Sequence, residues 1–175
     1  MDIAYKLDVL WCRTFQAVLK VGNYFMGYRM PHYLEGPGKI AELGNFLKEK
    51  KINDVLVVTG SGMVRRGQVK PMLDGFEAAG IRYTLQTYDT TDPTSDDVEA
   101  GYKTYKENDC KAIVALGGGS RIDCAKGIAA KAVHPRKKVA QLQGLLKVHW
   151  PIPTFVAIPT TAGAGSETTV AAVIT

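Results

Sequence analysis

From residue 29 onward, short apolar runs alternate with longer stretches in which apolar residues recur at helical spacing. The clearest run is DVLVVT at 54–59, which is rich in β-branched residues, almost unbroken in apolarity and followed by glycine. That pattern is typical of a strand buried on both faces. Such alternation predicts βαβ units, and hence a Rossmann-like α/β fold with a mostly parallel sheet and flanking helices. Further strands are expected at 81–88, 112–116 and 154–158, and helices at 39–50, 68–79, 95–108 and 120–133.

The N-terminal stretch follows this alternation less closely. Residues 8–20 have the spacing of a short amphipathic helix, so we expect 1–28 to be an extension packed on a domain formed by 29–175. The aromatic side chains of the extension could cover a neighbouring copy or only their own core, which leaves a homo-oligomer open. The apolar positions expected to face inward are Leu10, Phe15 and Leu19.

The C-terminal stretch, TTVAAVIT at 168–175, is rich in β-formers and ends without a turn, a cap or a polar tail. We expect it to be a strand. An exposed apolar edge strand is a feature that natural proteins usually avoid. We therefore expect the chain to be a fragment of a longer protein.

The composition and the distribution of charge argue against several classes of protein. The 175 residues are 46% hydrophobic and 22% charged, with a formal net charge of +5, as in an ordinary globular protein. The basic residues form scattered clusters, whereas a nucleic-acid binder gathers them on one face. No apolar run approaches the roughly 20 residues of a membrane span. Three cysteines without C-x-x-C spacing suit a reducing compartment, and Asp2 and Asp8 interrupt any signal-peptide core. We expect a cytoplasmic protein that binds neither nucleic acid nor membranes.

The strongest local signal is ALGGGSRIDCAK at 115–126, which places three glycines between a buried strand and a helix. Without side chains the backbone can approach a ligand closely, and a helix start offers unpaired N–H groups to an anion such as a diphosphate. Ser120 is expected both to cap the helix and to donate to a phosphate. The alternative is a flexible turn before a capped helix. The stretch matches neither G-x-G-x-x-G nor the G-x-x-x-x-G-K-[ST] phosphate loop.

A second signal, IPTTAGAGSE at 158–167, puts two hydroxyls, two glycines and a carboxylate directly after a strand. Ligands of open α/β sheets bind at the carboxyl ends of strands, so this loop and the triple-glycine loop could share one crevice. Alone, such a stretch is more often a polar turn. Two such loops after two core strands favour a nucleotide site.

The two loops also resemble a known family. GGGSRIDCAK at 117–126 and PTTAGAGSE at 159–167 are similar to the two signatures of the iron-containing (group III) alcohol dehydrogenases, whose relatives include glycerol dehydrogenase and 3-dehydroquinate synthase. The resemblance covers about 29–175. It implies a dinucleotide-binding α/β domain followed by an all-helical metal-binding domain that is absent from this chain. It also implies hydride transfer between a primary alcohol, or its aldehyde, and a nicotinamide.

By that resemblance, the triple glycine and the following serine hold the cofactor diphosphate, three threonines line the cofactor, and Val173 lies near the nicotinamide. Ala164 stands where the family often has a threonine, so a hydroxyl contact is lost or taken over by Ser166. The complete set of expected cofactor-binding residues is Gly60, Gly117, Gly118, Gly119, Ser120, Asp123, Thr160, Thr161, Ser166, Thr169 and Val173.

The third glycine-bearing loop, VTGSGMVRRG at 58–67, lacks the third glycine of a dinucleotide fingerprint. Gly60 stands where the family frequently has a ribose-binding aspartate. A carboxylate there would repel a 2′-phosphate, whereas glycine leaves room and Arg65 or Arg66 could pair with that phosphate. We therefore expect NADP as the cofactor, with NAD as the alternative.

The resemblance places the family's metal ligands, an aspartate and a set of histidines, downstream of Thr175. None of His32, His134 and His149 lies in a matching motif, so no metal ligand is assigned in this chain, and Fe²⁺ or Zn²⁺ is expected only in a full-length enzyme. The catalytic residues are likewise unassigned, and the chain alone is expected to bind cofactor without turnover. The alternatives are a lyase of the dehydroquinate-synthase type, a relative of glycerol dehydrogenase, or a stand-alone nucleotide-binding module.

Overall fold

The structure is a computed structural model that describes residues 3–25, 31–144, 147–169 and 171–175. It divides into two units, Met1–Tyr33 and Leu34–Thr175.

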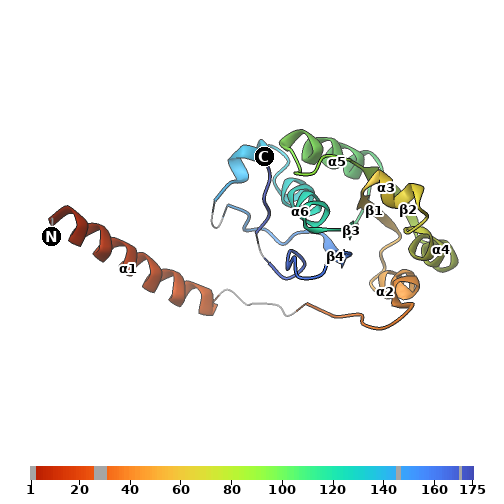
Figure 1. The fold of residues 1–175 in the computed structure, drawn as a ribbon, viewed down its shortest axis with the longest axis horizontal. Coiled ribbons are helices and arrows are strands. Elements are labelled where there is room, and N and C mark those ends of the chain that lie inside the picture. The colour runs from red at the N-terminus through yellow and green to blue at the C-terminus, as the bar shows by residue number, and fades with distance from the viewer. Residues whose placement is uncertain (1–2, 26–30, 145–146, 170) are drawn as a thin grey trace. The chain divides into compact units, whose positions relative to one another are not determined.

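The N-terminal unit contains one helix, α1, at Ile3–Phe25 (Figure 1). This helix is longer than the predicted 8–20. Taken by itself, the unit leaves Leu10 and Phe15 largely exposed, so the expected packing of 1–28 on the rest of the chain stays a prediction. None of the helices in the described ranges is both long and apolar enough to cross a membrane.

The second unit is built on a four-stranded sheet of order β2-β1-β3-β4, in which every neighbouring pair is parallel. The predicted α/β fold with a parallel sheet is therefore confirmed. The carboxyl ends of the strands are level, because Thr59 pairs with Thr87 and Leu116, and Gly117 pairs with Pro159. The strands are β1 (Asp54–Thr59), β2 (Arg82–Thr87), β3 (Ala112–Gly117) and β4 (Thr154–Pro159).

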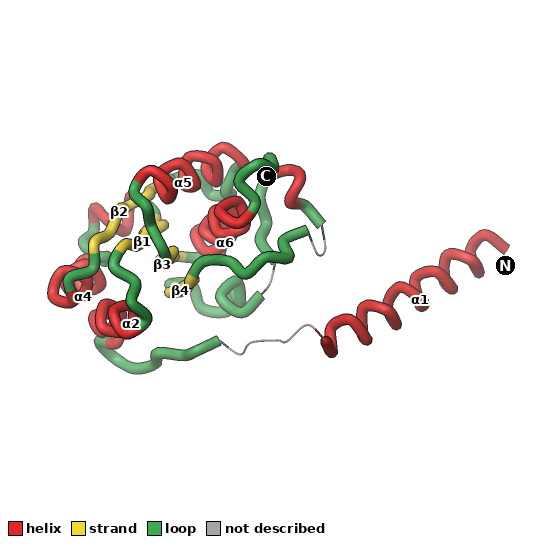
Figure 2. Tube along the Cα trace, turned by 180° about the vertical axis from the view of Figure 1, so that it is seen from behind, coloured by secondary structure: helices red, strands yellow, loops and turns green. Residues whose placement is uncertain are grey.

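Helices cover both faces of this sheet, with α5 and α6 on one side and α2 and α4 on the other (Figure 1 and Figure 2). Residues of β1 alternate between the two resulting cores: Val55 and Val57 pack towards α2 and α4, and Leu56 and Val58 towards α5 and α6. Burial on both faces explains why residues 55–58 are apolar at every position. The helices are η1 (Lys39–Glu42), α2 (Leu43–Glu49), α3 (Ser61–Arg65), α4 (Lys70–Ala79), α5 (Ser95–Glu107), α6 (Gly119–Val133) and η2 (Val139–Leu142).

The ends of these helices follow from local chemistry. At the start of α5, the Thr94 hydroxyl accepts from the Asp97 N–H, and the Asp97 carboxylate accepts from the Thr94 N–H, which is a complete capping box. Helix α4 ends at Gly80, whose positive φ of 72° suits glycine.

The expected C-terminal strand is not formed within the described part of 168–175. Instead, the Thr175 N–H donates to the Pro93 carbonyl, and the Thr175 carbonyl accepts from the Ser95 N–H, so this segment is held at the start of α5 (Figure 2). The prediction was wrong because β-propensity alone decides little when the backbone bonds go to another element. Residue 170 lies outside the described residues.

Candidate functional site

The loops after the strands frame a cavity of about 650 Å³ at the carboxyl edge of the sheet. The cavity lies between the loop after β1 and the glycine loop after β3, and Thr160, which follows β4, forms part of its wall. This size falls within the ~300–1,000 Å³ that is typical of small-molecule sites. Of the predicted cofactor residues, the cavity wall contains Gly60, Gly117, Gly118, Ser120 and Thr160.

The two glycine-bearing loops lie against each other, and their glycines are what permits the contact. A Cβ added at Gly118 would lie 3.0 Å from the Thr161 hydroxyl oxygen, and one at Gly119 would lie 2.9 Å from that of Ser166. The Thr160 N–H also donates to the Gly117 carbonyl at 3.0 Å. The predicted shared crevice therefore has a physical basis in the structure, since a larger residue at either glycine would require Thr161 or Ser166 to move.

Helix α6 begins directly at this junction. Its N-cap is Gly118, without a side-chain cap, and the Gly118 carbonyl accepts from the N–H groups of Arg121 and Ile122. Ser120 therefore lies in the first turn, and its predicted role as N-cap was wrong, because the helix starts before it. The first N–H groups of a helix have no intrahelical partner and carry the positive end of its dipole. The junction thus suits a bound anion.

The loop after β1 is organised by polar side chains. Gly60 is buried and extended, with φ of −89°, and is followed at once by α3. The Ser61 N–H donates to the Asp89 carboxylate at 3.2 Å, and the Ser61 hydroxyl lies 2.5 Å from the same oxygen. These bonds from Ser61 hold the pKa of Asp89 below its usual range, and nearby Arg65 and Arg121 lower it further. Asp89 is therefore ionised at neutral pH.

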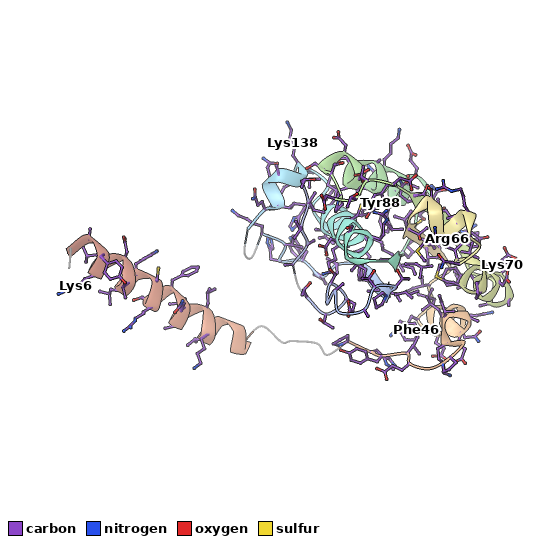
Figure 3. The ribbon with its side chains drawn as sticks, viewed as in Figure 1. Lys6, Phe46, Arg66, Lys70, Tyr88 and Lys138 are labelled. Atoms are coloured by element: carbon purple, nitrogen blue, oxygen red, sulfur yellow. The ribbon has the colours of Figure 1, made fainter. Side chains whose placement is uncertain are left out.

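Arg121 reaches from α6 back towards this loop. Its Nη1 donates to the Thr90 carbonyl at 2.7 Å, and its guanidinium carbon lies 4.4 Å from the ring centre of Tyr88. Tyr88 is labelled in Figure 3. The Tyr88 hydroxyl donates to the Ser120 carbonyl at 2.6 Å, and burial raises the pKa of Tyr88. Tyr88 therefore links the end of β2 to the start of α6.

The remaining predicted residues gather on the other side of α6. The Asp123 carboxylate accepts from the Val173 N–H at 3.1 Å, and the Lys126 ammonium donates to the Thr169 hydroxyl at 2.9 Å and to the Ala171 carbonyl at 2.7 Å. Burial lowers the pKa of Lys126, and Asp123, 3.7 Å away, opposes that effect. Asp123, Thr169 and Val173 are thus brought together, but away from the wall of the cavity.

Comparison with known proteins assigns this arrangement to a family. Residues 31–175 match the sequence model of iron-containing alcohol dehydrogenases. The chain belongs to the iron-containing alcohol dehydrogenase family. The resemblance carried by the two glycine-bearing loops is therefore confirmed.

Individual family members match over most of this chain. It is 34% identical over 153 residues to the NAD-dependent methanol dehydrogenase of Bacillus methanolicus, covering 87% of this chain and 39% of that protein. It is 33% identical over 158 residues to the 1,3-propanediol dehydrogenase of Klebsiella pneumoniae, covering 86% and 41%. The chain thus spans about 40% of the length of these relatives.

Solved structures agree with the sequence comparison. A crystal structure of a 1,3-propanediol oxidoreductase aligns with a TM-score of 0.70 at 33% identity, over 79% of this chain and 38% of that one. A sulfoacetaldehyde reductase from Bifidobacterium kashiwanohense in complex with NAD⁺ aligns with a TM-score of 0.69 at 26% identity, over 85% and 40%.

The described part of this chain contains no set of side chains that could hold the metal of the family. Among residues 3–25, 31–144, 147–169 and 171–175, no group of three or more histidine, cysteine, aspartate or glutamate residues could hold an ion. The rings of His134 and His149 lie 5.0 Å apart. Two histidines without a third ligand do not make a resident metal site, so we derive no step through a metal.

Three residues of the site were not singled out in the sequence: Asp89, Arg121 and Lys126. Asp89 directly follows a strand, as Gly60 does, so the rule that ligand-binding residues follow parallel strands could have found it. Arg121 and Lys126 both lie within the glycine-loop motif, but the motif does not show where their side chains reach.

Proposed function

We propose that this chain is the nucleotide-binding part of an NAD(P)-dependent alcohol dehydrogenase that transfers hydride between a small primary alcohol, or its aldehyde, and the nicotinamide. The observation that carries the proposal is the junction at the start of α6, where two loops meet through glycine at the carboxyl edge of a parallel sheet. The names of the relatives, which include methanol and 1,3-propanediol dehydrogenases, support the substrate class.

The residues of the junction fit a dinucleotide. Gly118 caps α6 without a side chain, so the first N–H groups of the helix can bind a diphosphate, and Ser120 in the first turn adds a hydroxyl. Thr160 and Thr161 stand beside Gly117 and Gly118. The nicotinamide, when bound, supplies the hydride acceptor or donor, and the chain contributes its binding and orientation.

The predicted roles of the other residues remain part of this proposal. Ser166 packs against Gly119, which puts its hydroxyl at the same junction. Thr169 and Val173 are held by Lys126 and Asp123, so a fixed strip of backbone is available to the nicotinamide half of the cofactor. Asp123 would then act through the backbone that it positions.

For the cofactor, we propose NADP in preference to NAD. Gly60 leaves the end of β1 without a carboxylate, and the cavity wall holds Arg65, Arg66 and Arg121 against one aspartate, Asp89. An excess of cations suits the additional phosphate of NADP. NAD is the competitor, since it is named for the methanol dehydrogenase and for the sulfoacetaldehyde reductase complex.

The test is a fluorescence titration of the chain with NADPH and with NADH. We expect saturable binding of both, tighter for NADPH, and a loss of at least about tenfold in Gly119→Val, whose side chain would displace Ser166. Gly22→Ala is the control, because a Cβ at Gly22 would meet nothing within 4 Å. Absence of binding by either nucleotide, with circular dichroism showing a folded chain, would refute the proposal.

A further inference from the structure

The side chain of Arg121 occupies the space that Gly60 leaves empty. A Cβ built on Gly60 would lie 3.2 Å from Arg121 Nε and 3.5 Å from Nη2. Gly60 is therefore the position that the guanidinium covers, although Arg121 belongs to α6 and Gly60 to the end of β1. A single side chain thus connects the glycine junction to the end of β1, which we call the adenosine end of the cavity because the 2′-phosphate of NADP is proposed to bind there.

We propose that Arg121 is the specificity-determining residue that binds the 2′-phosphate of NADP(H). The inference rests on the proposed function, and it deepens it by assigning the cofactor preference to one residue. A guanidinium presents five N–H donors in a planar fork that matches phosphate oxygens. The bond from Nη1 to the Thr90 carbonyl uses one donor and leaves others for a ligand.

The surroundings of Arg121 fix it before any ligand arrives. The Tyr88 ring supports one face of the guanidinium, and Tyr88 is itself tied to the Ser120 carbonyl. Arg121 is half-buried, whereas Arg65 and Arg66 are exposed. A side chain that is already ordered loses less entropy when it binds, so it contributes more to affinity.

The other two arginines also use one donor each, but their side chains are exposed, whereas Arg121 is half-buried. Arg65 Nη1 donates to the Ser61 hydroxyl at 2.9 Å, and Arg66 Nε donates to the Gln68 side chain at 3.2 Å. We therefore assign the 2′-phosphate to Arg121 and not to Arg65 or Arg66, the two residues expected from the sequence. They add positive potential to the cavity, but Arg121 makes the contact.

Asp89 is the opposing charge. Its carboxylate is held by Ser61 beside Gly60, and it is the group that could instead accept from the ribose hydroxyls of NAD. The cavity wall carries three arginines against this one carboxylate, so the net potential at the adenosine end favours the phosphate. If the negative charge of Asp89 outweighed the three arginines, the chain would prefer the nucleotide without a 2′-phosphate.

Calorimetric titration of the 175-residue chain with adenosine 2′,5′-bisphosphate and with 5′-AMP isolates this contact from the nicotinamide half. We expect the bisphosphate to bind at least about tenfold tighter than AMP. Arg121→Gln removes most of that ratio and changes AMP affinity less than about twofold. Arg121→Lys, which keeps the charge without the planar fork, gives an intermediate ratio.

Arg66→Gln is the matched control, since it removes the same charge from the same cavity. We expect it to lower the ratio less than about threefold. Circular dichroism and the retained AMP affinity show that each variant is folded.

The inference is overturned if Arg121→Gln keeps the wild-type ratio, if Arg66→Gln abolishes the ratio instead, or if the wild-type chain binds AMP as tightly as the bisphosphate. If AMP and NADH still bind in these cases, the proposed nucleotide binding survives, although the third outcome would also remove the proposed preference for NADP. Failure of AMP, the bisphosphate and NADH alike would refute the proposed function, and this inference with it.

Discussion

The loops after β1 and β3 both follow a central strand of the same sheet, yet they are built by different means. After β3, three glycines leave room for neighbouring side chains, and a Cβ at any of them would lie within 3.0 Å of Arg121, Thr161 or Ser166. After β1, the order comes from side chains: Ser61 on Asp89, and Arg121 over Gly60. Under the proposed function, the first arrangement binds what all dinucleotides share, and the second distinguishes between them.

The two loops should also respond separately to substitution. Glycine-to-larger substitutions after β3 should damage binding of every nucleotide, because they close the junction itself. Side-chain substitutions after β1 should alter the preference between nucleotides and leave the junction intact. Single substitutions in each loop test that separation.

The largest effect is expected from Gly117→Val. Gly117 has a φ of 155°, and its added Cβ would lie 2.6 Å from Arg121 Cγ. We expect a loss of about 2–3 kcal/mol in the free energy of unfolding, measured by urea denaturation, together with loss of binding of both NADPH and NADH. A variant of wild-type stability that still binds both nucleotides would show that the loop tolerates side chains.

Gly60→Asp should change the preference between NADPH and NADH without abolishing nucleotide binding. The new carboxylate would lie against the Arg121 guanidinium, pair with it and repel a 2′-phosphate. We expect the ratio of NADPH to NADH affinity to fall by about tenfold, equivalent to about 1.4 kcal/mol, with NADH binding retained. If the ratio of NADPH to NADH affinity were unchanged in the fluorescence titration, the loop after β1 would not set the preference between the two nucleotides.

Thr59→Val tests the bond that joins the two strand ends. The buried Thr59 hydroxyl donates to the Leu116 carbonyl at 2.8 Å, directly before both loops. Valine keeps the shape and removes the donor, so we expect about 1 kcal/mol less stability in urea denaturation. Nucleotide preference should stay as in the wild type, and a changed preference would mean that the two loops are not independent.

The smallest effect concerns the pH dependence carried by Asp89. Because hydrogen bonds from Ser61 lower the pKa of Asp89 in the folded state, its contribution to stability is present above the unfolded pKa. That contribution is lost as pH falls through the lower, folded pKa. Ser61→Ala should raise the pKa of Asp89 towards its usual value, which carboxyl-carbon NMR titration measures. A pKa that does not move in this variant would show that Ser61 does not set it.

Much of the fold was predictable because its signals are local. The apolar runs that became β1 and β3 and the glycine that ends α4 each act within a few residues, and the structure has them almost as predicted. The strand expected at 168–175 failed for the opposite reason. Its backbone bonds go to Pro93 and Ser95, which the segment's own composition does not reveal.

The site, like the fold, combines features that local sequence predicts with features that depend on residues far apart in the chain. The glycine junction could be predicted, since two loops after parallel strands must open at one edge of the sheet. Asp89 and Ser61 are 28 residues apart, and they meet only because β2 pairs with β1 in a register that sets Thr87 beside Thr59. The reach of Arg121 depends on that register too. Side-chain convergence of this kind needs the strand order, which the sequence pattern left open.

The central claim is that a nicotinamide nucleotide binds at the glycine junction and extends over the loop after β1. Amide chemical shifts of the ¹⁵N-labelled chain, followed during saturation with NADPH, test it most directly. The account predicts that the largest shifts fall at 117–121, with a second group at 60–66 and at Asp89. Saturable NADPH binding that leaves the amides of 117–121 unmoved, while shifts gather at another surface, would contradict it.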